Sequence, residues 1–78
     1  MDDKTILAHI DDLVAEEHEL RARSGQLDDE AQQRLGHLEE QLDQSWDLLR
    51  QRRARRDSGE DPGLAEVRPA EEVERYLD

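Results

Sequence analysis

Five arginines fall within seven consecutive positions of this 78-residue chain, one helical turn after a tryptophan. The residues are Trp46, Arg50, Arg52, Arg53, Arg55 and Arg56. An arginine guanidinium presents its N–H donors as a planar fork that matches phosphates and carboxylates. The tryptophan adds an indole ring that can stack on a flat ligand or fill an apolar pocket. The segment is therefore a candidate binding site for an anionic ligand or an acidic protein surface.

The charge of the remaining chain allows another role for these arginines. The formal net charge is -11 at pH 7, and residues 50–56 form one cationic segment within an acidic chain. Residues 57–78 carry eight acids and two bases, so this tail can neutralise the arginines internally. The acidic balance disfavours general nucleic-acid affinity, which depends on clustered cations. Internal neutralisation, protein binding and phosphate binding all stay open.

The other polar residues match no catalytic or metal-binding motif. Cysteine is absent, which excludes thiolate chemistry. His9, His18 and His37 lack the glutamate three positions earlier that dinuclear metal sites in helical bundles require. Adjacent acids such as Glu39 and Glu40 point in different directions on a helix and do not converge on a substrate. We therefore expect no enzyme, no cofactor and no metal site.

Two amphipathic helices are expected to position the arginines. Residues 3–23 have Asp2 or Asp3 as a candidate N-cap, and residues 28–56 have Asp28. Spacings of three and four place two apolar stripes face to face: Ile6, Ile10, Leu13 and Leu20 on the first helix; Ala31, Leu35, Leu38, Leu42, Ser45 and Leu49 on the second. With a turn at 24–27, residues 1–56 predict an all-α fold, an antiparallel two-helix hairpin with coiled-coil-like packing.

Residues 57–78 are predicted to be an acidic linker and tail. The linker DSGEDPG, residues 57–63, combines polar residues with glycine and proline and should end the second helix. Pro69 is placed to start a short helix at 70–77, with Val73, Tyr76 and Leu77 on one side. Such short helices are marginal in water unless they dock. The sequence leaves open whether the tail is docked or disordered.

The expected helix lengths place the arginines at a free end of the hairpin. At a rise of about 1.5 Å per residue, the helices span about 31 and 44 Å. The start of the first helix then reaches about Arg50. We expect Arg52, Arg53, Arg55 and Arg56 to project past the first helix, where an external ligand can contact them.

The apolar surface is wider than two helices can cover. Beside the expected contact between the helices lie Leu7, Val14, Trp46 and Leu48. A hairpin of this size has a marginal core, and small scaffolds often compensate by oligomerising. We expect these four residues to form the interface of a homodimer, most simply a four-helix bundle. The alternative is that they receive the apolar side of the tail.

Three segments carry a resemblance to a known family: ILAHIDDLVAEEHELR, LDQSWDLLRQRRARRDSGEDP and EVRPAEEVERYL. Across nearly its whole length the chain resembles a family of short uncharacterised proteins from high-GC Gram-positive bacteria, known as a domain of unknown function. The resemblance implies a small cytoplasmic helical protein and supplies no ligand-binding residue. The acidic start, MDDKTILAHIDD, also lacks the apolar run of a signal peptide or a membrane-spanning helix, so we expect a soluble protein with no membrane contact.

The expected function is that of a small non-enzymatic interaction or regulatory protein, which binds an unidentified protein partner through its arginine-rich helix end. The alternative is a phosphate-ligand binder, for a nucleotide or nucleic acid, that uses the same arginines and is gated by the acidic tail. The tail separates the two hypotheses. Its acids disfavour phosphate unless the tail moves away, whereas a protein partner can replace it.

Overall fold

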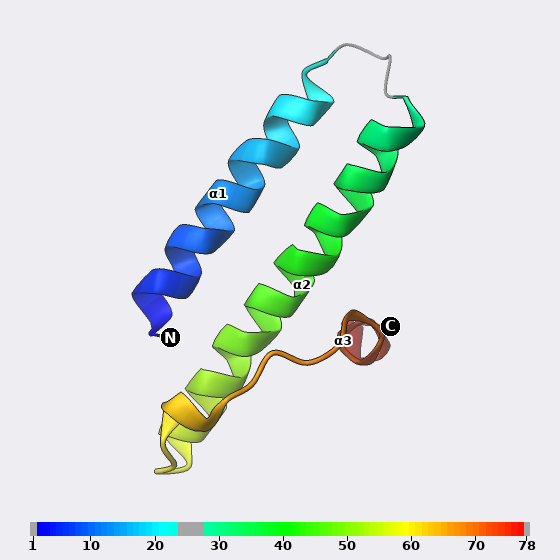
Figure 1. Cartoon of the computed structure of the whole chain (residues 1–78). Coiled ribbons are helices and arrows are strands. Elements are labelled where there is room, and N and C mark those ends of the chain that lie inside the picture. The colour runs from blue at the N-terminus through cyan, green and yellow to red at the C-terminus, as the bar shows by residue number, and fades with distance from the viewer. Residues whose placement is uncertain (1, 24–27, 78) are drawn as a thin grey trace.

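The computed structural model describes residues 2–23 and 28–77, without the side chains of Tyr76 and Leu77. Its elements are α1 (Asp3–Arg21), α2 (Asp29–Asp57), the 3-10 helix η1 (Pro62–Leu64) and α3 (Ala70–Leu77), and no strand occurs within these ranges. Figure 1 shows α1 and α2 side by side in an elongated molecule of 49 × 25 × 15 Å. The prediction of an all-α helical hairpin is confirmed. The expected turn at 24–27 lies outside the described residues.

Both long helices begin at an aspartate cap. Asp2 Oδ1 accepts a hydrogen bond from the Thr5 N–H at 2.8 Å, and Asp28 Oδ1 accepts one from the Ala31 N–H at 2.8 Å. These carboxylates satisfy N–H groups that have no partner within the helix. The chain leaves α2 through Gly59, whose φ of 74° lies in the left-handed region that glycine tolerates best. Local sequence signals therefore define where both helices start and where α2 ends.

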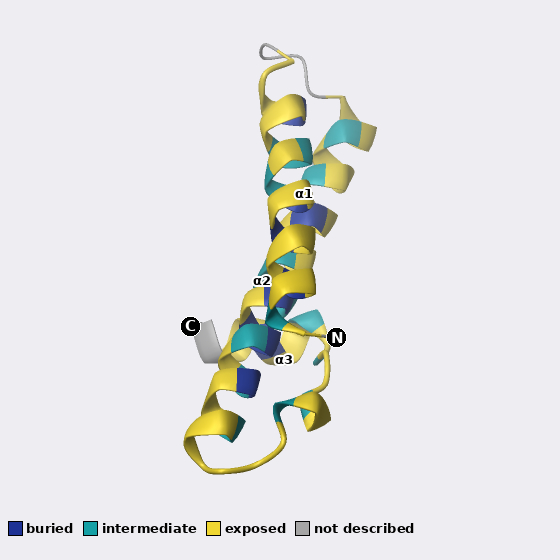
Figure 2. Ribbon diagram, turned by 90° about the vertical axis from the view of Figure 1, so that its left-hand side faces the viewer, coloured by how far each residue is buried: buried dark blue, intermediate teal, exposed yellow. Residues whose placement is uncertain are grey.

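Two aliphatic clusters hold α1 against α2. Near the start of α1, Ile6 and Ile10 pack on Leu48, and further along the hairpin Leu13 and Leu20 form a cluster with Leu38. Figure 2 shows the buried positions as dark blue segments along the two long helices. The partly buried residues around them are Val14, Ala31, Leu35, Leu42, Leu49 and Ala65. The expected apolar stripes of both helices are confirmed.

Leu48 does not lie where the sequence pattern placed it. We expected it at a homodimer interface, but its side chain is buried against Ile6 and Ile10. The reason is that the tail returns over this part of the hairpin: Ala65 packs on the same cluster, and Val67 lines a pocket together with Leu48. Together, α1 and the tail cover a wider arc of α2 than α1 alone would cover. Leu48 therefore belongs to the internal core.

The tail is docked on α2. Helix α3 is seen end on in Figure 1 while α2 is seen from the side, so α3 crosses α2 and does not run along it. Val73 is fully buried. The side-chain amides of Gln44 and Gln51 on α2 donate hydrogen bonds to the carbonyl oxygens of Arg68 and Glu66, at 3.1 and 2.7 Å. The apolar residue Val73 and two side-chain amides thus fix the returning segment, and η1, which the sequence did not predict, packs on the end of α2.

Candidate functional site

The carboxylate of Asp3, at the start of α1, receives two of the five arginines. Arg52 donates from Nε to Asp3 Oδ1 at 2.6 Å and from Nη1 to the carbonyl oxygen of Pro62 at 3.2 Å. Arg56 Nη2 lies 2.7 Å from Asp3 Oδ2. The hydrogen bonds from Arg56 and then Arg52 lower the pKa of the Asp3 carboxyl, and Asp3 raises the pKa of Arg56. This cluster joins α1, α2 and η1.

The Asp3 cluster corrects the expected overhang. Helix α2 does extend past the start of α1 (Figure 1), but Asp3 reaches Arg52 and Arg56, two and six residues beyond the expected Arg50. Arg52 is only 9% exposed, so the prediction that it projects freely was wrong. The spacing of residues on α2 did not show that η1 folds back beneath the arginines and offers the Pro62 carbonyl as an acceptor.

Arg50 and Arg53 are the exposed arginines of this segment that form no direct ion pair within the described residues, although Arg50 helps to lower the pKa of Asp47. Arg55, by contrast, is paired with Glu60 at 3.1 Å. Arg50 and Arg53 follow Trp46 by four and seven positions, which places all three side chains on one helical face. Trp46 is 45% exposed. The same face continues towards the start of α2 with Asp43 and Glu39, which lie three and seven positions before the tryptophan. We call the five residues of this face the Trp46 stripe: Glu39, Asp43, Trp46, Arg50 and Arg53.

The tail docks on a different side of α2 from the Trp46 stripe. Its hydrogen bonds are made to Gln44, Asp47 and Gln51. Successive residues of a helix are turned by about 100°, so each of these three side chains points at least about 100° away from Trp46. These anchoring contacts of the tail therefore lie away from the Trp46 stripe, and Trp46 itself is 45% exposed.

Helix α1 adds apolar side chains on the same side as Trp46. The pocket formed with Val67 of the tail includes His9, so His9 marks the flank of α1 that faces the tail. Leu7 and Val14 lie about 160° and 140° around the helix from His9, on the opposite flank. Leu7 is 45% exposed, and Val14 is half-buried against the core. Three of the four residues expected at a dimer interface therefore share one side of the hairpin.

A buried ion pair between α2 and the tail was missed by sequence reasoning. Asp47 is 2% exposed and accepts hydrogen bonds from Arg68 Nε at 2.9 Å, from Arg68 Nη2, and from Gln51 Nε2 at 2.9 Å. The hydrogen bonds from Arg68 lower the pKa of Asp47. The one hint in the sequence was that Arg68 is a cation among the acidic residues of the tail, but its partner could not be read from helix spacing. The Asp47–Arg68 pair joins α2 to the tail and is therefore a docking contact.

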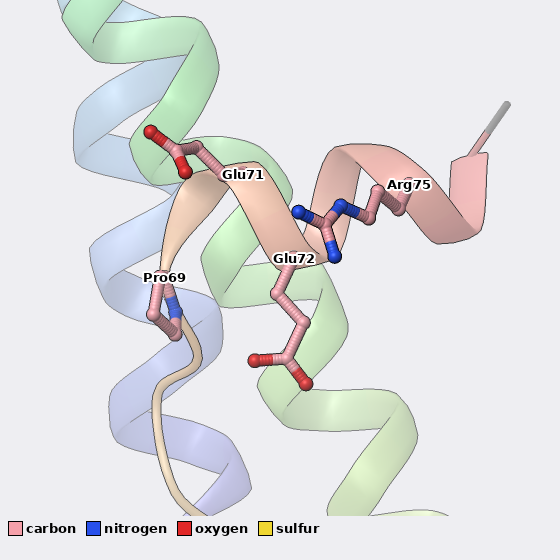
Figure 3. A pocket seen from close by; sticks show the side chains of 4 residues that line it. All are labelled: Pro69, Glu71, Glu72 and Arg75. Atoms are coloured by element: carbon pink, nitrogen blue, oxygen red, sulfur yellow. The ribbon is translucent and has the colours of Figure 1, made fainter.

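Two hollows open on the surface of the described residues. A pocket of about 190 Å³ between α1, α2 and the tail is lined by Ile6, His9, Gln41, Gln44, Ser45, Leu48 and Val67. An open hollow of about 560 Å³ beside α3 is lined by Pro69, Glu71, Glu72 and Arg75, and the Arg75 side chain extends back towards Glu72 (Figure 3). In residues 2–23 and 28–77, no cluster of three histidine or acidic side chains is arranged to hold a metal ion. No helix in these ranges is long and apolar enough to cross a membrane.

Comparison with known proteins finds relatives along most of the chain. It is 57% identical over 77 residues, covering 95% of this chain and 88% of each relative, to uncharacterized protein Mb0922c of Mycobacterium bovis (strain ATCC BAA-935 / AF2122/97) and to uncharacterized protein Rv0898c of Mycobacterium tuberculosis (strain ATCC 25618 / H37Rv). No solved structure matches it. The resemblance to uncharacterised proteins of high-GC Gram-positive bacteria is confirmed. A family model described as "Protein of unknown function (DUF2630)" matches residues 2–78, and the chain therefore belongs to this family.

Proposed function

We propose that this protein is a small non-enzymatic interaction protein of a regulatory kind, which binds another protein chain through the Trp46 stripe. The observation that carries the proposal is the division of the arginines. Arg52, Arg55 and Arg56 form direct ion pairs within the chain, whereas Arg50 and Arg53 lie exposed on the face of Trp46 and form none in the described part. Arg50 also interacts electrostatically with Asp47. Tryptophan and arginine are the residue types most enriched at the energetic centres of protein interfaces.

The charge around Trp46 favours a protein surface over a phosphate ligand. Phosphate binding gains from several guanidinium forks that converge on one anion, and here Arg52 and Arg56 converge on Asp3 instead. The two remaining arginines share their face with Asp43 and Glu39, which repel a polyanion. An interface of mixed charge around one aromatic side chain suits a helix or an acidic patch of another protein.

The test is affinity capture from a nuclease-treated lysate of the source organism, quantified by mass spectrometry. Wild type is compared with Arg50→Glu/Arg53→Glu. The matched control is Arg23→Glu/Arg75→Glu, which changes the net charge equally at two exposed arginines outside the stripe. We expect a partner recovered by wild type and control and reduced about 10-fold or more by the stripe variant. Capture profiles that do not differ between the two variants would contradict the proposal. A partner recovered only when the capture is repeated from an untreated lysate would favour the phosphate alternative.

The homodimer expected from the sequence belongs to the same proposal. Leu7, Val14 and Trp46 remain candidates for its interface because they share the open side of the hairpin, whereas Leu48 is buried inside the chain. The interface is thus proposed to use the side of α2 that faces away from the tail.

A further inference from the structure

We infer that the protein chain bound by the Trp46 stripe is a second copy of this protein, with its α2 packed antiparallel on the first across a two-fold axis beside Trp46. This inference rests on the proposed function, because it uses the same stripe. It adds the identity of the partner, the direction of its helix and the residues that pair. Three observations support it: the order of charges along α2, the position of the exposed apolar residues, and the side on which the tail docks.

The Trp46 stripe is acidic on the N-terminal side of Trp46 and basic on the C-terminal side. Glu39 and Asp43 precede Trp46 by seven and three positions, and Arg50 and Arg53 follow it by four and seven. When two copies of α2 pack antiparallel about an axis between residues 46 and 47, Arg50 lies level with Asp43 of the second copy. Arg53 lies within one residue, about 1.5 Å along the axis, of Glu39 of the second copy. Symmetry repeats both pairs, so the stripe is complementary to itself. A parallel arrangement would place arginine against arginine.

The centre of this interface is apolar. Ile6 and Ile10 pack on Leu48, so Leu7 lies within about one helical turn of the level of Trp46. Leu7 and Trp46 are also the two large apolar side chains that the described part of α1 and α2 leaves exposed, each at 45%. A two-fold axis at this level brings both residues of each copy together. The result is a four-helix bundle with an apolar centre and charged pairs on either side, the usual arrangement of a stable interface.

The hydrogen bonds and the ion pair that anchor the tail lie outside this packing surface. Arg68 and the Glu66 carbonyl dock on the side of α2 that carries Asp47 and Gln51, which is turned away from the stripe. Each copy has a net charge of -11, so long-range repulsion opposes association, and close opposite charges at the axis must offset it. A different partner that uses the stripe must displace the second copy.

A charge-exchange experiment on the full-length protein tests the inference. Arg50→Glu/Arg53→Glu makes the stripe wholly acidic, and Glu39→Arg/Asp43→Arg makes it wholly basic. Glu39 also pairs with Arg21 at 3.1 Å, but both side chains are 58% exposed, so losing that pair has little effect on folding. We expect a dimeric wild type, and for each variant alone a dimer dissociation constant raised about 10- to 100-fold. An equimolar mixture of the two variants should form a heterodimer. Sedimentation equilibrium at about 150 mM salt measures the masses.

Two controls make the result specific. Arg23→Glu/Arg75→Glu changes the net charge as much as the acidic variant and should remain dimeric. Because the chain has no cysteine, Asp43→Cys and Arg50→Cys can report direction: mixed together under oxidation they should form a crosslink between the two variants, and each alone should not. Because Trp46 is the one tryptophan, its emission should shift to shorter wavelength as the dimer forms.

The inference is overturned by a folded wild-type monomer at 100 μM, a concentration of about 10⁻⁴ M at which a specific dimer is populated. It is equally overturned by charge variants that stay dimeric alone, or by a mixture that stays monomeric. These outcomes are distinct from failure of the proposed function. A folded monomer that still captures another protein through Arg50 and Arg53 contradicts the second copy but agrees with the proposed function. A dimer that captures no other protein agrees with the second copy but contradicts binding to a different protein.

Discussion

At the scale of the residue, one step along α2 separates an arginine of the interior from one of the surface. Arg52 and Arg53 are turned by about 100° from each other. Arg52 is almost buried between Asp3 and Pro62, and Arg53 is exposed. Reversing the charge of Arg52 or Arg56 would disturb the Asp3 cluster as well as any interface. Arg50 and Arg53 are therefore the arginines whose substitution reports on binding rather than on folding.

Gly36 and Gly59 predict opposite effects of the same substitution. Gly59 has a φ of 74°, and Gly36 lies within α2; at both positions a Cβ would meet no atom within 4 Å. Gly59→Ala should lower the free energy of unfolding by about 1–2 kcal/mol, because an L side chain is strained in the left-handed region. Gly36→Ala should raise it by about 0.5–1 kcal/mol, because alanine favours the helix. Urea unfolding followed by circular dichroism measures both, and equal effects would contradict the backbone argument.

At the scale of the element, the described side chains attach α3 to the hairpin through one buried aliphatic residue and one ion pair. Val73 is fully buried, and Arg68 reaches Asp47 just before the helix starts. α1 and α2, in contrast, share two separate aliphatic clusters. The hairpin should therefore be more stable against local opening than the docked tail.

Val73→Asp is expected to release the tail while the hairpin stays folded. Burying an unpaired carboxylate at this apolar position is energetically unfavourable. Backbone amides of α3 should then exchange with solvent about 10-fold faster or more, and those at Ile10 and Leu38 should keep their protection. Glu74→Gln, at an exposed neighbouring position, is the control and should change neither. If protection at Ile10 and Leu38 were lost as well, the tail would be part of the same cooperative unit as the hairpin.

The elements whose signals are local could be predicted from the sequence, and those that depend on distant contacts could not. The aspartate caps, the apolar stripes and the short helix after Pro69 all follow from neighbouring residues. The burial of Leu48 and of Arg52 depends on where the tail returns, which helix spacing does not contain. The Trp46 stripe was found in part: Trp46, Arg50 and Arg53 were among the candidates, but their separation from Arg52, Arg55 and Arg56 required the tertiary partners.

At the scale of the whole molecule, stability should depend on pH through carboxylates that carry hydrogen bonds. The hydrogen bonds from Thr5 and the arginines lower the pKa values of Asp2, Asp3 and Asp47 below 3.8. The unfolded chain then binds more protons in acid than the folded one. The stabilisation is present above the ordinary carboxyl pKa and is lost as pH falls through the lowered folded values.

Asp47→Asn tests this dependence. At pH 7 the variant should have a free energy of unfolding about 1–3 kcal/mol below wild type, because the charged acceptor of Arg68 is lost. The difference should begin to shrink as pH falls below the ordinary carboxyl pKa, because the unfolded chain then takes up the proton first, and should vanish once folded Asp47 is protonated below its lowered pKa. Asp12→Asn, at an exposed position of α1, is the control and should show a small difference that does not vary with pH. A constant difference for Asp47→Asn would contradict the role of its charge.

The shared guanidinium of Arg52 also bears on the order in which the molecule assembles. Its contact with the Pro62 carbonyl closes a separation of ten residues, whereas its contact with Asp3 spans 49 residues. The short loop at Gly59 loses less entropy on closing than the long one, so the Pro62 contact is expected to form early. Asp3 reaches Arg52 only when the two helices have paired along nearly all of α1. The first turn of α1 then docks onto an arginine that a local turn has already oriented, which makes the Asp3–Arg52 contact a marker for the last step of hairpin folding.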